Sequence, residues 1–241
     1  MKLPELFEGP TFSEGDIVSF SFDEAAVSLK VVPLPSNSTK LNRVSVQSDF
    51  IETDLAGWQV LGDTGFFDRD LVTQSWNYYR CDNHLKLAAI FFEVSVLRHS
   101  DEEADSLMSM NYQHFYNVLL DDFRELHGDF KPKILEGSPS VENNFLAQAI
   151  PHEDIDGLRV KLFINEGAPY PSTCGYFSLG SRYTLRINFR MDSVDYPDFA
   201  NPLNEEFYRE LQEQLFDDFL ANLSIEYTNE AKQTIRRLAE G

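Results

Sequence analysis

Hydrophobic and polar residues alternate in several short stretches of the chain, which is the pattern of a strand with one buried face. Near the N-terminus the alternation covers residues 16–22 and resumes over residues 27–31 after an acidic pair. A shorter alternation, over residues 44–46, follows a loop rich in proline and serine. These patterns predict a β-hairpin or two edge strands, followed by one short strand.

Two longer stretches, residues 71–80 and 84–98, are joined across Asp82-Asn83 and predict another strand pair. The second stretch carries apolar residues on both faces, which favours a central strand covered on each side, with a helix as the alternative. Glu93 interrupts this apolar run. We expect it to meet a basic side chain, because a carboxylate among apolar neighbours needs a partner; a catalytic role is the less favoured interpretation.

The second half of the chain contains two more predicted strand pairs. Residues 145–150 and 158–164 are separated by a turn sequence rich in aspartate, and residues 174–179 and 183–190 by Gly180-Ser181. Both pairs predict antiparallel hairpins. In the last strand Arg186 and Arg190 alternate with apolar residues, so its polar face is either solvated or lines a site.

Apolar residues recur at intervals of three and four in three other segments, as expected of amphipathic helices. The first runs from Ser100 to Gly128, the second covers residues 204–223, and a short third covers residues 229–239. The first two are acidic. Residues 101–127 contain seven Asp or Glu and one Arg, and residues 204–226 contain the same numbers.

Strands that arrive in hairpin pairs, together with two long helices, predict an α+β fold. We expect a largely antiparallel sheet packed against two long acidic amphipathic helices. The loop-like segment 131–144 divides the chain into residues 1–130 and 131–241, two α+β halves of what we expect to be one compact unit. Both long helices contain Phe-Tyr and Asp-Asp-Phe fragments, so the halves are either similar tandem copies or share these letters by chance.

The charge balance narrows the choice of partners. Among 241 residues there are 40 Asp and Glu against 20 Lys and Arg, a formal net charge of −20. Such a chain repels the phosphates of nucleic acids and anionic lipid headgroups, which argues against nucleic-acid and membrane partners. A basic protein partner is compatible with it, although an acidic surface also serves solubility alone.

Features of targeting and redox chemistry predict a soluble cytoplasmic protein. The longest apolar stretch, residues 85–97, contains charges and is shorter than the roughly 20 residues that span a bilayer. The N-terminus has acids and a proline where a signal peptide needs an apolar run. Cys81 and Cys174, the only cysteines, are too few for a disulfide framework, and we expect both to be reduced.

Helical-wheel geometry places two carboxylates inside the apolar stripes of the predicted helices. At about 100° per residue, Asp122 lies about 20° from Phe115, and Asp218 lies about 20° from Phe207. A buried carboxylate is costly unless it is paired, so we expect each to meet an arginine, a tyrosine hydroxyl or backbone donors. Structural ion pairs are the favoured interpretation, and acid–base catalysis or binding of a hard cation is the alternative. The candidate arginine partners are Arg80, Arg186 and Arg190.

Signatures of cofactor and metal binding are missing from the sequence. It contains neither of the glycine-rich phosphate loops, and its five histidines never form a pair spaced three or four residues apart on one helix. We therefore expect no cofactor and no metal site.

Two functional hypotheses remain. The first, which we favour, is a non-enzymatic binding module, such as an antidote, adaptor or chaperone, that meets a more basic partner through its acidic helical faces. The second is an enzyme or small-ligand binder with a pocket lined by carboxylates and arginines. The candidate binding residues are Glu93, Asp122, Asp218, Arg186 and Arg190.

Overall fold

The structure is a computed structural model of the chain, and it describes nine segments of the sequence. These are residues 7–8, 12–32, 44–46, 58–60, 67–80, 86–98, 145–162, 172–193 and 205–239.

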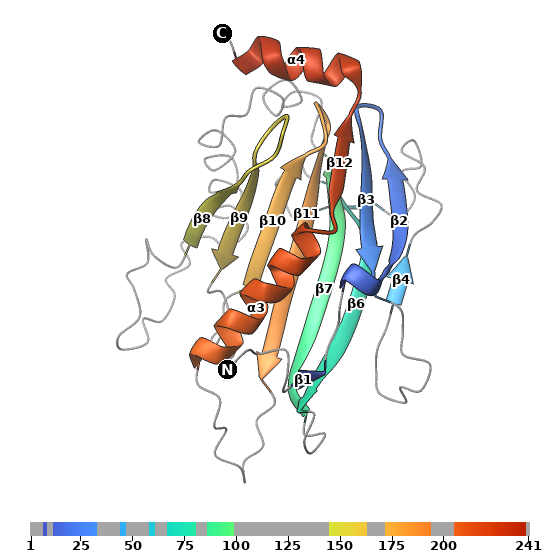
Figure 1. Cartoon of the computed structure of the whole chain (residues 1–241). Coiled ribbons are helices and arrows are strands. Elements are labelled where there is room, and N and C mark those ends of the chain that lie inside the picture. Colours follow the sequence, from blue (N-terminus) through green and yellow to red (C-terminus); the bar gives the residue numbers. More distant parts are fainter. Residues whose placement is uncertain are drawn as a thin grey trace.

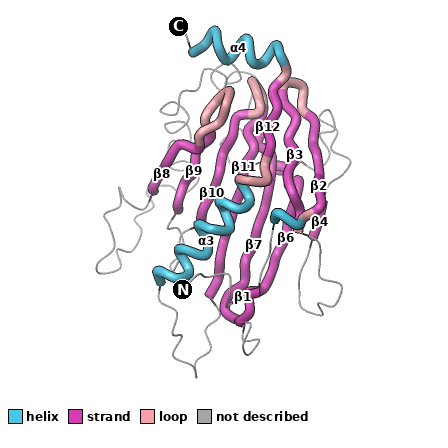
Figure 2. Tube along the Cα trace, viewed as in Figure 1, coloured by secondary structure: helices cyan, strands magenta, loops and turns pink. Residues whose placement is uncertain are grey.

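These residues form two antiparallel sheets and few helices (Figure 2). Nine of the described strands make the large sheet, in the order β1-β6-β7-β11-β10-β9-β8 with β4 and β5 also beside β6. Its strands are β1 (Phe7–Glu8), β4 (Val44–Val46), β5 (Gln59–Val60), β6 (Phe67–Arg80), β7 (Lys86–Arg98), β8 (Phe145–Ile150), β9 (Gly157–Leu162), β10 (Ser172–Ser178) and β11 (Tyr183–Ser193). The small sheet has the order β12-β3-β2, from β2 (Asp16–Ser21), β3 (Ala25–Val31) and β12 (Ser224–Tyr227).

The predicted hairpins are confirmed. β2 pairs with β3, β6 with β7, β8 with β9 and β10 with β11, all antiparallel. The stretch with apolar residues on both faces is strand β7, and it lies between β6 and β11 inside the large sheet, as predicted. The helical alternative for it is wrong.

The expected fold class is wrong. The described residues are mostly strand, and their only α-helices are the short α3 (Glu205–Leu220) and α4 (Asn229–Ala239), besides the single 3-10 turn η2 (Phe12–Glu14). The second predicted helix, residues 204–223, corresponds to α3, which ends at Leu220. Residues 224–227, for which no strand was predicted, alternate between exposed and buried and form β12. The first, Ser100 to Gly128, lies outside the described residues. The sheets dominate because β6, β7 and β11 are 14, 13 and 11 residues long.

Strand pairing crosses the middle of the sequence in both sheets. β7 pairs with β11 over the whole length of the latter, and β3 pairs with the C-terminal strand β12. Both sheets therefore contain strands from each half of the chain. The division into residues 1–130 and 131–241, and the duplication of the halves, stay predictions.

The core lies between the large sheet and a layer made of the small sheet and α3. Figure 1 shows the small sheet and α3 lying side by side on one face of the large sheet, with α4 at one end. We call this the first face; its residues on β7 and β11 include Phe92, Val94, Ile187 and Phe189, all at most 1% exposed. Phe12 of η2 joins the layers, with ring centroids 5.4 Å from Phe92 and 5.2 Å from Phe219 of α3.

Candidate ligand-binding site

Strand alternation directs a different set of side chains to the opposite side of the large sheet, which we call the second face. On β7, Glu93 and Ser95 alternate with the core residues Val94 and Phe92, so they lie on the second face. Ser95 is directly opposite Asp70 on β6 and Arg186 on β11. Paired residues of antiparallel strands project to the same side, so β6, β7 and β11 bring acidic, hydroxyl and basic groups together.

Arg186 is the centre of this group. Its Nη2 atom donates to Asp68 Oδ2 at 2.5 Å and to Glu93 Oε1 at 2.9 Å. The side chains of Arg186 and Asp68 are 20% and 13% exposed, and that of Glu93 is 31% exposed. We name Asp68, Asp70, Glu93, Ser95 and Arg186 the Arg186 cluster. The expectation that Glu93 meets a basic side chain is confirmed.

The Arg186 cluster carries more negative than positive charge. Three carboxylates and one guanidinium give −3 + 1 = −2 when all are ionised. Burial, opposed by Arg186 and reinforced by the other acids, raises the pKa of Glu93. Burial and the neighbouring Asp68 likewise raise the pKa of Asp70. The site is therefore short of positive charge, and both carboxyls hold their protons to higher pH than usual.

Several buried polar atoms of the cluster have no hydrogen-bond partner within the described part of the chain. They are Asp68 Oδ1, Ser95 Oγ and Arg186 Nε. Ser95 is wholly buried. A buried polar group without a partner costs about 1–3 kcal/mol, so these atoms favour any ligand that satisfies them. Asp68 Oδ1 offers an acceptor, Arg186 Nε a donor, and the hydroxyl can act as either.

Arg190 lies next to the cluster on the same face but takes part in a different contact. Its guanidinium stacks over the ring of Phe91 with 4.6 Å between Cζ and the ring centroid. Phe91 is 40% exposed, so an apolar surface borders the charged group. Arg190 therefore lies on the same face as Arg186, four residues further along β11, and is not part of the Arg186 cluster.

Cys174 lies below this surface and is unsuited to nucleophilic chemistry. Its thiol is buried and donates to Asn188 Oδ1 at 3.6 Å. Burial raises the pKa of Cys174 to about 11, so the thiol stays protonated at neutral pH.

Asp218 is far from the cluster and has a structural role. It projects from α3, where its Oδ2 atom accepts a hydrogen bond at 3.0 Å from the backbone N–H of Phe12. The expected pairing of an inward carboxylate with a backbone donor is confirmed at this residue. Its contact ties η2 to α3 and leaves no role for Asp218 in the cluster. Asp122 lies outside the described residues.

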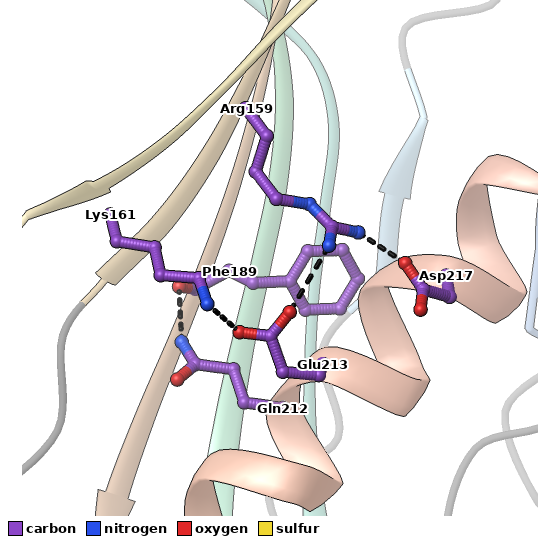
Figure 3. Close-up of polar contacts among 6 residues, drawn as sticks. All are labelled: Arg159, Lys161, Phe189, Gln212, Glu213 and Asp217. Atoms are coloured by element: carbon purple, nitrogen blue, oxygen red, sulfur yellow. Dashed lines mark hydrogen bonds and ion pairs between the residues drawn. The ribbon is translucent and has the colours of Figure 1, made fainter. Parts of the chain in front are cut away.

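The acids of α3 serve a second internal contact, shown in Figure 3. Arg159 of β9 donates to Glu213 at 3.1 Å and also contacts Asp217, while Lys161 contacts Glu213 from the other side. The Arg159 guanidinium lies 4.4 Å over the ring of Phe216. This network fixes α3 to the large sheet, so Glu213 and Asp217, two of the acids expected to face a partner, contact basic residues of the same chain.

Sequence reasoning missed three members of the cluster. Asp68 and Asp70 precede Leu71, where the predicted strand began, and Ser95 was hidden inside an apolar run. The two-residue spacing of Asp68 and Asp70 is a strand signal, but its phase differs from that of the rest of β6, where Val72, Gln74 and Trp76 are buried. A register shift between Asp70 and Val72 interrupts that period, and both Leu71 and Val72 are buried. The shift explains why the strand appeared shorter in the sequence.

Other kinds of site receive no support from the described residues. Among them no group of three His, Cys, Asp or Glu is placed to hold a metal ion. None of the helices in these ranges has the length and apolar composition required to cross a membrane. Comparisons with protein-family models, with curated proteins and with solved structures found no match to this chain.

Proposed function

We propose that this protein is a non-enzymatic binding module that meets a basic protein partner on the second face of its large sheet, with the Arg186 cluster as the anchor. The observation that carries this proposal is an uncompensated charge beside buried polar atoms that lack partners. A cationic side chain placed there would neutralise the excess and satisfy acceptors at the same time.

The binding surface differs from the acidic helical faces expected from the sequence. Glu213, Asp217 and Asp218 of α3 already contact groups of the same chain. Their charges are therefore partly compensated inside the molecule. The second face instead exposes Asp70 and Phe91, so it offers a partner both charge and an apolar contact.

The net charge supports the choice of partner. At −20, the whole chain attracts a basic protein over distances of a Debye length, about 10 Å at 0.1 M salt. The same charge disfavours nucleic acid and anionic membrane surfaces. The composition and the two cysteines fit a cytoplasmic location for this encounter.

A small cationic ligand is a second candidate, because the unpartnered atoms of the cluster are few and close to one another in the strand register. Both candidates use the same residues, so one set of variants tests them.

The test is a titration of the full chain with a fluorescein-labelled oligolysine peptide, followed by fluorescence anisotropy. Neutralising the exposed Asp70 and the half-buried Glu93 together, in Asp70→Asn with Glu93→Gln, should weaken binding about tenfold, since two ion pairs at a partly exposed site contribute about 1.4 kcal/mol together. Asp16→Asn is the matched control, because Asp16 is an exposed aspartate of the small sheet.

The salt dependence provides a further check. Binding to the wild type should weaken as salt is added, and the neutralised variant should depend less on salt. Equal weakening by Asp16→Asn and by the double variant would show that the peptide responds to overall charge, and would exclude the Arg186 cluster as the anchor.

A further inference from the structure

The acceptors of the Arg186 cluster match the donors of one kind of cation. Asp70 and Ser95 face each other across β6 and β7, and Glu93 lies on the same face of β7 two residues before Ser95. Two carboxylates and a hydroxyl thus border one position. A primary ammonium has three N–H donors on a compact centre, whereas a guanidinium is a planar fork that suits bidentate pairing with one carboxylate.

Ser95 sets a limit on the size of the bound group. Its side chain is 0% exposed, and its Oγ atom has no partner among the described residues. It lies between Asp70 and Arg186 in the strand register. A group that reaches this hydroxyl has to enter between the longer side chains around it, which favours the smaller ammonium over a guanidinium.

Arg186 adds a requirement that a lysine side chain does not meet. Its Nε–H is a buried donor without a partner in the described ranges, while its Nη2 atom is already used by Asp68 and Glu93. The ligand therefore needs an acceptor oxygen a few bonds from the ammonium. An α-ammonium group has such an oxygen nearby, since the carbon bonded to Cα is a carbonyl or carboxylate carbon.

Building on the proposed function, we infer that the Arg186 cluster binds an α-ammonium group together with the neighbouring carbonyl oxygen. The ammonium donates to Asp70, Glu93 and Ser95, and the oxygen accepts from Arg186 Nε. Two sources carry this chemistry: the N-terminus of a polypeptide partner and a free amino acid. Capture of a chain terminus by a fixed set of polar groups is a known mode of peptide recognition.

Two short peptides of equal charge separate this inference from simple attraction of cations. One is Ala-Lys-Ala amide with a free N-terminus; the other is Ala-Lys-Lys amide with an acetylated N-terminus. Each carries two positive charges. Isothermal titration of the full chain should give a Kd about tenfold lower for the free N-terminus. Free alanine, added as a competitor of the peptide, distinguishes the two sources. If alanine binds as tightly as the peptide, the ligand is a free amino acid; if alanine binds more weakly, the ligand is the N-terminus of a polypeptide.

Ser95→Ala provides the matched variant, with Ser19→Ala as its control. Ser19 is exposed on β2 and its hydroxyl pairs with that of Ser28 at 2.8 Å, remote from the cluster. Ser95→Ala should weaken binding of the free N-terminus about fivefold and leave the acetylated peptide unchanged. The midpoint of thermal unfolding of Ser95→Ala should equal or exceed that of the wild type, because the substitution removes an unpartnered hydroxyl.

The outcomes that overturn the inference differ from those that overturn the proposed function. Equal binding of the two peptides, with Asp70→Asn and Glu93→Gln still weakening both, would refute α-ammonium recognition and keep the cluster as a site for basic groups. If the two substitutions leave peptide binding unchanged, or if the wild type binds neither peptide, both the α-ammonium inference and the proposed function are refuted.

Discussion

Removing the guanidinium of Arg186 should destabilise the protein through the acids that it now neutralises. In Arg186→Met, a side chain of similar length remains on β11, but Asp68 and Glu93 lose a donor at 2.5 and 2.9 Å. The three carboxylates then have no cationic partner within the Arg186 cluster. The fold must hold this charge, because the strand register fixes the positions of all three.

The magnitude follows from the exposure of the partners. Breaking a fully buried ion pair costs 3–5 kcal/mol, and an exposed pair contributes at most about 1 kcal/mol. The side chains of the Arg186 pairs are 13% to 31% exposed, between these limits. We therefore expect Arg186→Met to lower the free energy of unfolding by about 2 kcal/mol at neutral pH.

The pH dependence has a definite sign. The pKa values of Asp70 and Glu93 are already raised, so the folded state binds more protons than the unfolded state above their ordinary values of 3.8 and 4.5. Stability therefore falls as pH rises through the folded-state pKa values. Loss of Arg186 raises these pKa values further. The destabilisation should thus be largest at neutral pH and shrink as the pH falls below the ordinary values.

Urea unfolding followed by far-UV circular dichroism measures this free energy at neutral and acidic pH. Arg190→Met is the matched control, because Arg190 is an exposed arginine on the same strand and face. It should lower the free energy of unfolding by less than Arg186→Met does, because the Arg190 side chain is exposed. A loss in Arg186→Met no larger than that of Arg190→Met, or one that does not shrink at acidic pH, would refute the assigned role of Arg186.

Three further predictions concern other contacts. Glu213→Gln should lower the free energy of unfolding by about 1 kcal/mol at low salt and by less at high salt, because Glu213 pairs with two basic groups of β9. The control Glu210→Gln, at an exposed position of the same helix, should change this free energy little. Gly180→Ala should lower the free energy of unfolding by about 1–3 kcal/mol, and with it the midpoint of thermal unfolding. Gly180 has φ of +119°, and an added Cβ would lie 2.6 Å from Glu24 Cβ. Asp70→Asn should raise stability at neutral pH but not below pH 3.8, because its carboxylate is disfavoured in the fold; equal gains at both pH values would contradict the raised pKa.

The role of α3 changes how the acidity of the chain should be interpreted. A count of acids along the helix suggested an outward surface, yet Glu213 and Asp217 turn toward basic residues of β9 and Asp218 binds a backbone N–H. Net charge does not reveal which acids are compensated. Only the register of β9 beneath α3 places Arg159 and Lys161 within reach of the helix.

Local patterns in the sequence determined most of the individual elements in the described ranges. Alternation identified both strands of each hairpin, and the three- and four-residue spacing identified α3 and α4, because side-chain periods of 2 and 3.6 follow from local backbone geometry. Turn residues such as Gly180 fixed where strands separate. Asp218, which the helical wheel placed inside an apolar stripe, is half-buried and binds a backbone N–H.

Tertiary structure alone decided which elements meet. The pairing of β7 with β11 joins residues about 90 positions apart, and it brings Glu93 and Ser95 beside Arg186. No local pattern encodes such a register, because it depends on how two distant apolar faces are buried together. The same dependence decided that Ser224 to Tyr227, for which no strand was predicted, join the small sheet as β12. The sequence thus determined the strands, and long-range pairing determined the site.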